Sequence, residues 1–224
     1  MKYSKQMSES IKLGIILAVA GGFMDAYSYI GRGKVFANAQ TGNILLLGVN
    51  LSEGNGAQAV RYLFPVLAFV AGIALADLLR IRMERRKSLH WRQISVLLEA
   101  LILAAVCLIP QEMNLLANSL TSLACGIQVE SFRKIHGNGI ATTMCIGNLR
   151  SATQHIGTYL HTKEKETLQK GLLYYGIILC FIAGAVLGNI CVERFAEKAI
   201  LGSSLLLLAA FGMMFVDGEK ETFC

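Results

Sequence analysis

The chain has 224 residues, of which 54% are hydrophobic and only 16% are charged, and its formal net charge is +6. A soluble domain of ordinary composition carries about 25% charged residues. The mean hydropathy of +0.52 and the division into apolar blocks argue against a soluble protein and predict an all-α, polytopic helical membrane protein. The basic residues gather in loops, which favours contact with a lipid bilayer and its anionic headgroups over nucleic-acid binding.

Eight apolar segments follow one another along the chain. We predict them at about residues 11–30, 35–51, 60–79, 94–109, 115–132, 140–159, 171–192 and 199–216. The first is expected to be a spanning helix and not a cleaved signal peptide, because it continues past Tyr29 without a small-residue cleavage site. The main connections are a turn at 31–34, a strongly basic run at 80–92, a basic turn at 133–139 and a mixed-charge loop at 161–170.

Segments two and six carry polar, glycine-bearing sequence between apolar residues. The first copy reads V-F-A-N-A-Q-T-G-N-I-L-L-L-G from Val35, and the second reads I-A-T-T-M-C-I-G-N-L-R-S from Ile140. Each copy reaches a Gly-Asn pair and then meets apolar residues. Polar groups and glycines cost free energy inside a membrane unless they have a use. We therefore predict that the functional centre lies between these two Gly-Asn stretches.

The two Gly-Asn stretches belong to an internal repeat. A slide of 105 positions matches Gly21 with Gly126, and Asp25 with Glu130, and it superimposes the two Gly-Asn pairs. A slide of 112 then matches F-V-A-G-I-A-L-A-D from Phe69 with F-I-A-G-A-V-L-G-N further on. We predict a single membrane domain over 1–224, built from one repeat at about 11–110 and a second at about 113–216.

Charge and length favour six crossings over eight. The basic run at 80–92 is expected to be cytoplasmic. Six crossings put the tail with Lys2 and Lys5 on that side, whereas eight put the turn with Arg32 and Lys34 there. Segment two is at the lower limit of about 17 residues for crossing the hydrocarbon core. We expect six full spans plus two broken or re-entrant segments, which makes the repeats inverted; eight spans with parallel repeats are the alternative.

Two acids lie inside apolar segments at matching positions of the repeats. Asp25 and Glu130 would each cost at least about 2.5 kcal/mol as charges at the bilayer centre. Facing each other, they could bind a cation or exchange a proton. The alternative is that both lie near the surface, with Glu130 paired to Arg133 or Lys134 and Asp25 paired to Arg32.

Amide and hydroxyl groups near the Gly-Asn pairs could replace the hydration shell of a solute. The candidate solute-binding residues of this kind are Gln40, Thr41, Asn43, Gln128 and Asn148. Arg150 would balance the charge of an acid or attract an anionic solute. The alternatives are small-residue helix packing joined by hydrogen bonds for the stretches and a purely structural ion pair for Arg150.

Motifs of known enzyme chemistry are absent from the sequence. It contains no nucleophile elbow, zinc helix, phosphate loop or nucleotide fingerprint, no C-x-x-C pair, and no histidines at metal-ligand spacing. We therefore expect no enzymatic activity, no cofactor and no metal. A membrane enzyme that uses Asp25, Glu130, His136 or His155 remains a third hypothesis.

Four stretches together resemble the YoaK family of bacterial integral membrane proteins. They are G-G-F-M-D-A-Y-S-Y, V-F-A-N-A-Q-T-G-N, G-I-Q-V-E-S-F-R-K and A-T-T-M-C-I-G-N-L-R-S-A-T, and the resemblance extends over nearly the whole chain. It implies a multi-pass protein of the bacterial inner membrane with about six spans. It implies no substrate, because the family is classed as a domain of unknown function. Many relatives have an asparagine at Val129 and a threonine at Ile146, so those two positions are not candidates here.

These observations favour a small-solute transporter or channel. Asp25 and Glu130 would handle charge or protons, the amide and hydroxyl groups would coordinate the solute, and Arg150 would balance charge. The second hypothesis is a membrane scaffold or assembly partner that transports nothing. It predicts that the polar side chains are buried in direct contacts, with no cavity between the repeats.

Overall fold

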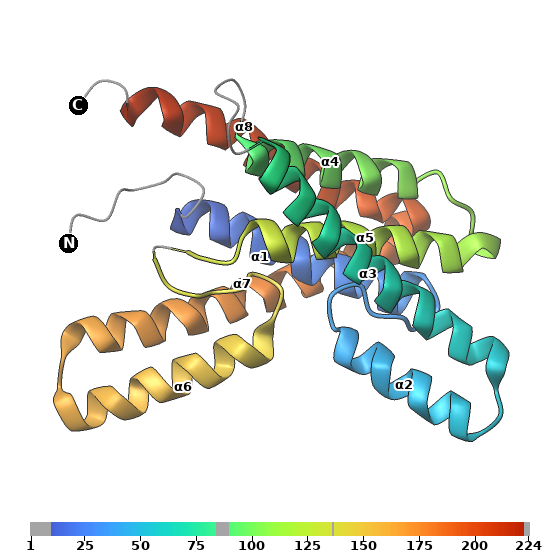
Figure 1. Cartoon of the computed structure of the whole chain (residues 1–224), viewed down its shortest axis with the longest axis horizontal. Helices are drawn as coiled ribbons and strands as arrows, with labels where there is room; N and C mark the ends of the chain where they lie inside the picture. Colours follow the sequence, from blue (N-terminus) through green and yellow to red (C-terminus); the bar gives the residue numbers. More distant parts are fainter. Residues whose placement is uncertain (1–9, 84–89, 136, 222–224) are drawn as a thin grey trace.

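The computed structural model describes residues 10–83, 90–135 and 137–221 (Figure 1). The tail lysines Lys2 and Lys5, the basic residues at 84–89 and His136 lie outside the described residues. The helices are α1 (Ile11–Ala26) with the π-helix η2 (Tyr27–Gly31), α2 (Gln40–Ser52), α3 (Gly56–Met83), α4 (Trp91–Val106), η3 (Gln111–Met113), α5 (Asn114–Ser131), α6 (Cys145–Thr162), α7 (Lys165–Phe195), η4 (Ala196–Ile200) and α8 (Leu201–Glu221). The predicted all-α fold is confirmed.

Segments two and six are broken, as predicted. Helices α2 and α6 each begin five residues later than the apolar segment that contains them, and the residues before them are not helical. The mixed-charge loop predicted at 161–170 is wrong, because α6 runs to Thr162 and α7 starts at Lys165. Charged side chains continue these helices, and Glu166 pairs with Lys170 one turn later at 2.7 Å.

The main helix pairs are exchanged between the two halves of the chain: each pair takes one helix from the first half and one from the second. Helix α1 packs along α7 and α5 packs along α3, while helices α2 and α6 lie against α3 and α7 respectively. Helix α4 lies between α5 and α8, and α8 also contacts α1. In Figure 1 the α2–α3 and α6–α7 arms extend to opposite sides below the central helices.

Glycines allow the exchanged pairs to approach closely. A Cβ at Gly126 would collide with the carbonyl of Phe69, and one at Gly22 would collide with the carbonyl of Phe181. Gly72 and Gly184, on the facing helices, are in the same situation. Small residues at such crossings let backbones come into contact, which is how membrane helices associate without a hydrophobic driving force.

Among the described residues, three segments are long and apolar enough to cross a membrane by length and composition: Ile11–Gly31, Gly56–Met83 and Lys165–Phe215, the last containing α7 and most of α8. Helix α2 has 13 residues, which span about 20 Å against a hydrocarbon core of about 30 Å. Large apolar side chains such as Leu179 and Leu205 point outward. These features are those of a polytopic membrane protein.

Helices α2 and α6 each lead the chain back to the end of the bundle at which the non-helical segment before them entered. Arg61, near the start of α3, donates to the carbonyl of Gly33 at 3.3 Å, so residues 34–60 enter and leave at one end. Tyr174 of α7 donates to the carbonyl of Gly139 at 3.4 Å, and Gly14 near the start of α1 lies against Ile135. The second broken segment therefore enters from the opposite end.

Candidate functional site

Asp25, in the second half of α1, is buried and holds the backbone ahead of α2. Its Oδ1 accepts hydrogen bonds from the N–H groups of Ala37 at 2.9 Å and Asn38 at 2.7 Å. Non-helical backbone in apolar surroundings must find partners, and a carboxylate is a strong acceptor for two N–H groups at once. Asp25 therefore anchors the first broken segment to α1.

The two non-helical segments meet at Gly21, in the middle of α1. The side-chain amide of Asn38 donates to the Gly21 carbonyl at 3.1 Å. Thr143, from the other segment, packs so closely that its methyl group lies 2.7 Å from where a Gly21 Cβ would be. We call Gly21, Asn38 and Thr143 the polar centre.

Two glutamines connect the broken segments to α5. Gln128 is fully buried, and its amide donates to the Leu17 carbonyl and to the Thr142 hydroxyl, both at 3.0 Å. Gln40, at the start of α2, donates to the Ala37 carbonyl at 2.7 Å and to the Ser122 hydroxyl at 3.3 Å. The predicted site residues Gln40 and Gln128 thus join α5 to the segments beside the polar centre, Gln40 at Ala37 and Gln128 at Thr142.

Asn43 and Asn148 make corresponding bonds within their own arms. Asn43 donates to the Phe36 carbonyl at 2.8 Å and accepts from the Phe36 N–H at 3.0 Å. Asn148 donates to the Ala141 carbonyl at 2.6 Å. Each asparagine therefore fixes the residue seven positions earlier, where the chain enters its helix. These bonds tie the two Gly-Asn pairs to their own segments.

Three predicted site residues lie apart from the polar centre. Glu130 is paired with Arg133 at 3.4 Å, the surface pairing that its spacing allowed. Thr41 and Arg150 are exposed. Among the described residues, no hydrogen bond or ion pair joins Asp25 to Glu130 or brings Arg150 to either acid.

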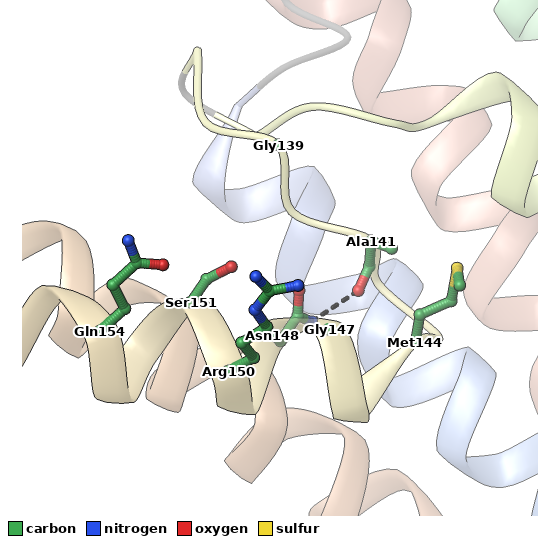
Figure 2. A pocket seen from close by; sticks show the side chains of 8 residues that line it. All are labelled: Gly139, Ala141, Met144, Gly147, Asn148, Arg150, Ser151 and Gln154. Carbon is green, nitrogen blue, oxygen red and sulfur yellow. Dashed lines mark hydrogen bonds between the residues drawn. The ribbon is translucent and has the colours of Figure 1, made fainter.

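A shallow hollow of about 330 Å³ lies beside the first half of α6 (Figure 2). It is lined by Gly139, Ala141, Met144, Gly147, Asn148, Arg150, Ser151 and Gln154. Gly147 has open space where a Cβ would lie, so the absence of a side chain there keeps the hollow open. One guanidinium group with hydroxyl and amide groups is suited to a polar or anionic molecule.

A second hollow of about 340 Å³ lies at the other end, lined by Cys107, Leu108, Ile109, Pro110, Gln111, Glu112, Glu197 and Lys198. Beneath this end lies Arg32, which is fully buried. Its guanidinium donates to the Tyr27 hydroxyl at 2.7 Å, to Asn114 Oδ1 at 3.1 Å and to carbonyls at the end of α4, including that of Ile109 at 2.7 Å. Arg32 thus binds the C-terminal end of a helix dipole, and none of these bonds joins it to Asp25.

Several buried oxygen atoms have no hydrogen-bond partner in the described part of the chain. They are Asn38 Oδ1, Asn118 Oδ1, Gln128 Oε1, Ser131 Oγ, Thr143 Oγ1 and both carboxyl oxygens of Glu99. Such atoms cost about 1–3 kcal/mol each when left unsatisfied. Two of them belong to the polar centre and a third to Gln128 beside it, so this part of the molecule offers acceptors to a solute, an ion or water.

Sequence reasoning did not select Glu99 or Arg32 as a site residue. For Glu99 a signal was available, because it is an acid inside the apolar run from Ile94 to Val106. For Arg32 the sequence indicated a surface turn, and only the packing of the α4 end over it shows the burial.

The matching protein-family model is described as a protein of unknown function (DUF1275), and it covers residues 13–213. The chain belongs to this family. It is similar to the "UPF0700 transmembrane protein YoaK" of Bacillus subtilis (strain 168), at 26% identity over 222 residues that cover 92% of this chain and 95% of that protein. No solved structure matches the chain. The predicted family is confirmed, and the family's transmembrane relative agrees with the apolar helices described above.

Proposed function

We propose that this chain is a multi-pass transporter or channel of the bacterial cytoplasmic membrane that passes a small polar solute through the polar centre. One observation carries the proposal: two non-helical segments enter from opposite ends of the bundle and meet at Gly21, the middle of a spanning helix. Irregular backbone at membrane depth occurs where it is buried in protein or lines a water-filled path. Transporters commonly place their binding site where such broken helices meet.

The starts of helices α2 and α6 add to this argument. Helix α2 begins two residues after Asn38, and α6 begins two residues after Thr143. Neither N-terminus is capped by a side chain. The N–H groups of Gln40 and Gly42 already donate to the carbonyls of Asn38 and Ala39, but the other N–H groups of the two first turns and a partial positive charge lie beside the polar centre from both sides. Together with the unpartnered oxygens of Asn38 and Thr143, they offer both donors and acceptors to a solute.

We further propose that the two halves are inverted repeats. Each first helix packs on the third helix of the other half, α1 on α7 and α5 on α3. Helices α1 and α5 run antiparallel, because Gln111 contacts Gly31 at one end and Gln128 contacts Leu17 at the other. In these contacts Gly22, rather than the sequence-matched Gly21, occupies the place that Gly126 has in the other half.

Cysteine accessibility tests the transporter proposal without knowledge of the solute. Thr143→Cys is made in a full-length variant whose native cysteines are replaced, and it is treated in vesicles with a membrane-impermeant thiol reagent from each side. The buried apolar position Leu103→Cys and the exposed position Ser52→Cys at the end of α2 serve as controls. We expect Thr143→Cys to react from both sides, at least ten-fold faster than Leu103→Cys.

Labelling of Thr143→Cys no faster than that of Leu103→Cys would overturn the proposal and support a scaffold. The scaffold is favoured by a specific observation, which is that Asp25, Asn43 and Asn148 bond to backbone. An enzyme has no such support in the described residues. His155 stacks on Tyr174 with ring centroids 5.7 Å apart, and none of the acids in the described ranges forms a hydrogen bond or ion pair with it.

A further inference from the structure

Glu99 is a buried acid that the transport proposal does not yet use. It lies in the middle of α4 (Trp91–Val106), its side chain has no exposed surface, and neither carboxyl oxygen has a hydrogen-bond partner within the described residues. An apolar residue in place of Glu99 would pack α4 at a lower free-energy cost, because burying an unpartnered carboxyl group inside a membrane is unfavourable. An intramembrane acid kept without a partner therefore points to a function.

Two serines of α8 bind backbone carbonyls of the residues next to Glu99 and next to Gly21. On α8, Ser204 donates to the carbonyl of Ala100, next to Glu99, at 2.8 Å. Its neighbour Ser203 donates to the carbonyl of Ala20, next to Gly21, at 3.3 Å. Each hydroxyl oxygen retains acceptor capacity. Two consecutive serines therefore join α4 to α1 between Glu99 and the polar centre.

Within the described part of the chain, no cation forms a hydrogen bond or ion pair with Glu99. Cys125 of α5 lies within electrostatic range of both Glu99 and Asp25, and residues 201–215 of α8 contain no titratable side chain. On α3, Asp77 pairs with Arg80, and on η4 Glu197 and Lys198 line the second hollow at the end of the bundle. A carboxylate at Glu99 would thus be an uncompensated buried charge, which is far more costly than a neutral acid.

We propose that Glu99 is the proton-binding residue of the transport cycle. In the conformation described, Glu99 is a neutral carboxylic acid. When the bundle opens and admits water, the O–H bond of Glu99 breaks, the proton passes to a water molecule as hydronium, and the carboxylate that remains is solvated by water. Reclosure requires that a proton return. This inference rests on the proposed transport function and names the proton as its coupling ion.

Infrared spectroscopy of the full-length protein in lipid vesicles tests this directly. The carbonyl stretch of a neutral carboxylic acid is recorded at neutral pH for the wild type and for Glu99→Gln, which keeps the shape and the neutrality of the acid. We expect one neutral-acid band in the wild type that is lost in Glu99→Gln. On transfer to D₂O this band should shift within minutes, because the Glu99 proton exchanges with bulk water.

Two results would overturn the proposal: spectra of the wild type and Glu99→Gln with no difference in this band, or a Glu99 band that stays unshifted for hours in D₂O. The second result would mark Glu99 as a sealed structural acid. These outcomes are separate from cysteine labelling. If Thr143→Cys is accessible but Glu99 is sealed or charged, the transport proposal stands and only the role of the proton as coupling ion is rejected.

A second variant distinguishes function from structure by stability. Glu99→Leu removes the unpartnered carboxyl group and leaves a side chain of similar volume in an apolar setting. If Glu99 is kept for proton binding, we expect the unfolding midpoint of Glu99→Leu to equal or exceed that of the wild type. A midpoint lowered by several degrees, with Ser95→Ala on the same helix as the control, would show that Glu99 is retained for folding and would contradict the proposal.

Discussion

At the scale of single residues, buried polar side chains in this molecule mostly serve the backbone. Asp25 and Asn43 each bond to main-chain groups of the segment that precedes α2. The physical reason is that peptide groups outside a helix find no water in a bilayer, so side chains must replace it. The atoms left over, such as Asn38 Oδ1 and Thr143 Oγ1, are those that can serve a ligand.

Asn43→Ala should destabilise the fold strongly. The substitution removes the partners of both the N–H and the carbonyl of Phe36, at about 1–3 kcal/mol for each buried group. We expect a loss of about 2–4 kcal/mol in unfolding free energy, measured by denaturant titration in mixed micelles. Asn50→Ala on the same helix, where one half-buried bond to Leu46 is lost, is the matched control with a loss near 1 kcal/mol. Equal effects of the two variants would contradict the anchoring role of Asn43.

At the scale of elements, the broken segments and the close helix pairs are coupled. Helix α1 ends in a π-helical turn (Tyr27–Gly31) that directs the Tyr27 hydroxyl to Arg32. The chain then re-enters the bundle at Ala37 and Asn38, whose N–H groups donate to the carboxylate of Asp25. Because α1 also packs on α7 through Gly22 and Gly184, a shift of α7 would reach the polar centre through α1.

Gly126→Ala should weaken the α3–α5 pair. The added Cβ would collide with the backbone carbonyl of Phe69, and overpacking of this kind costs about 1–3 kcal/mol. Gly176→Ala, on α7 with open space around its Cβ position, should instead stabilise its helix by up to about 1 kcal/mol. Thermal unfolding of the two variants beside the wild type checks the pair, and a neutral Gly126→Ala would refute the close approach.

At the scale of the whole molecule, two arms that each enter and leave at one end, at opposite ends of the bundle, favour the predicted six crossings over eight. The second arm brings the α6–α7 turn back to the end of the bundle at which α5 ends. The η4 helix lies at the other end, because its residues line the same hollow as Gln111. Positive residues such as Arg80 and Arg82 at the end of α3 assign that end of α3 to the cytoplasm.

The arrangement predicts the sidedness of two turns. Six crossings place Lys163, in the α6–α7 turn, inside the cell and Glu197 outside, whereas eight crossings reverse both. Lys163→Cys and Glu197→Cys are each labelled in intact cells with an impermeant thiol reagent, with Glu112→Cys as an outside control in either topology. We expect Glu197→Cys to react and Lys163→Cys to react only after permeabilisation. The reverse pattern would establish eight crossings.

The sequence by itself determined the membrane class and most of the helical segments, since both follow from local hydropathy. It also indicated that segments two and six are broken, but the non-helical residues precede the Gly-Asn pairs, which lie inside α2 and α6. It also predicted Gln40, Asn43, Gln128 and Asn148 as solute-binding residues, and in the structure each of these side chains donates to a backbone carbonyl. The local spacing already allowed the pair of Glu130 with Arg133, whereas tertiary structure alone decided that Arg32 is buried beneath the end of α4. Burial and partner choice depend on residues far apart in the chain, and the exchange of helices between the two halves decides which of them meet.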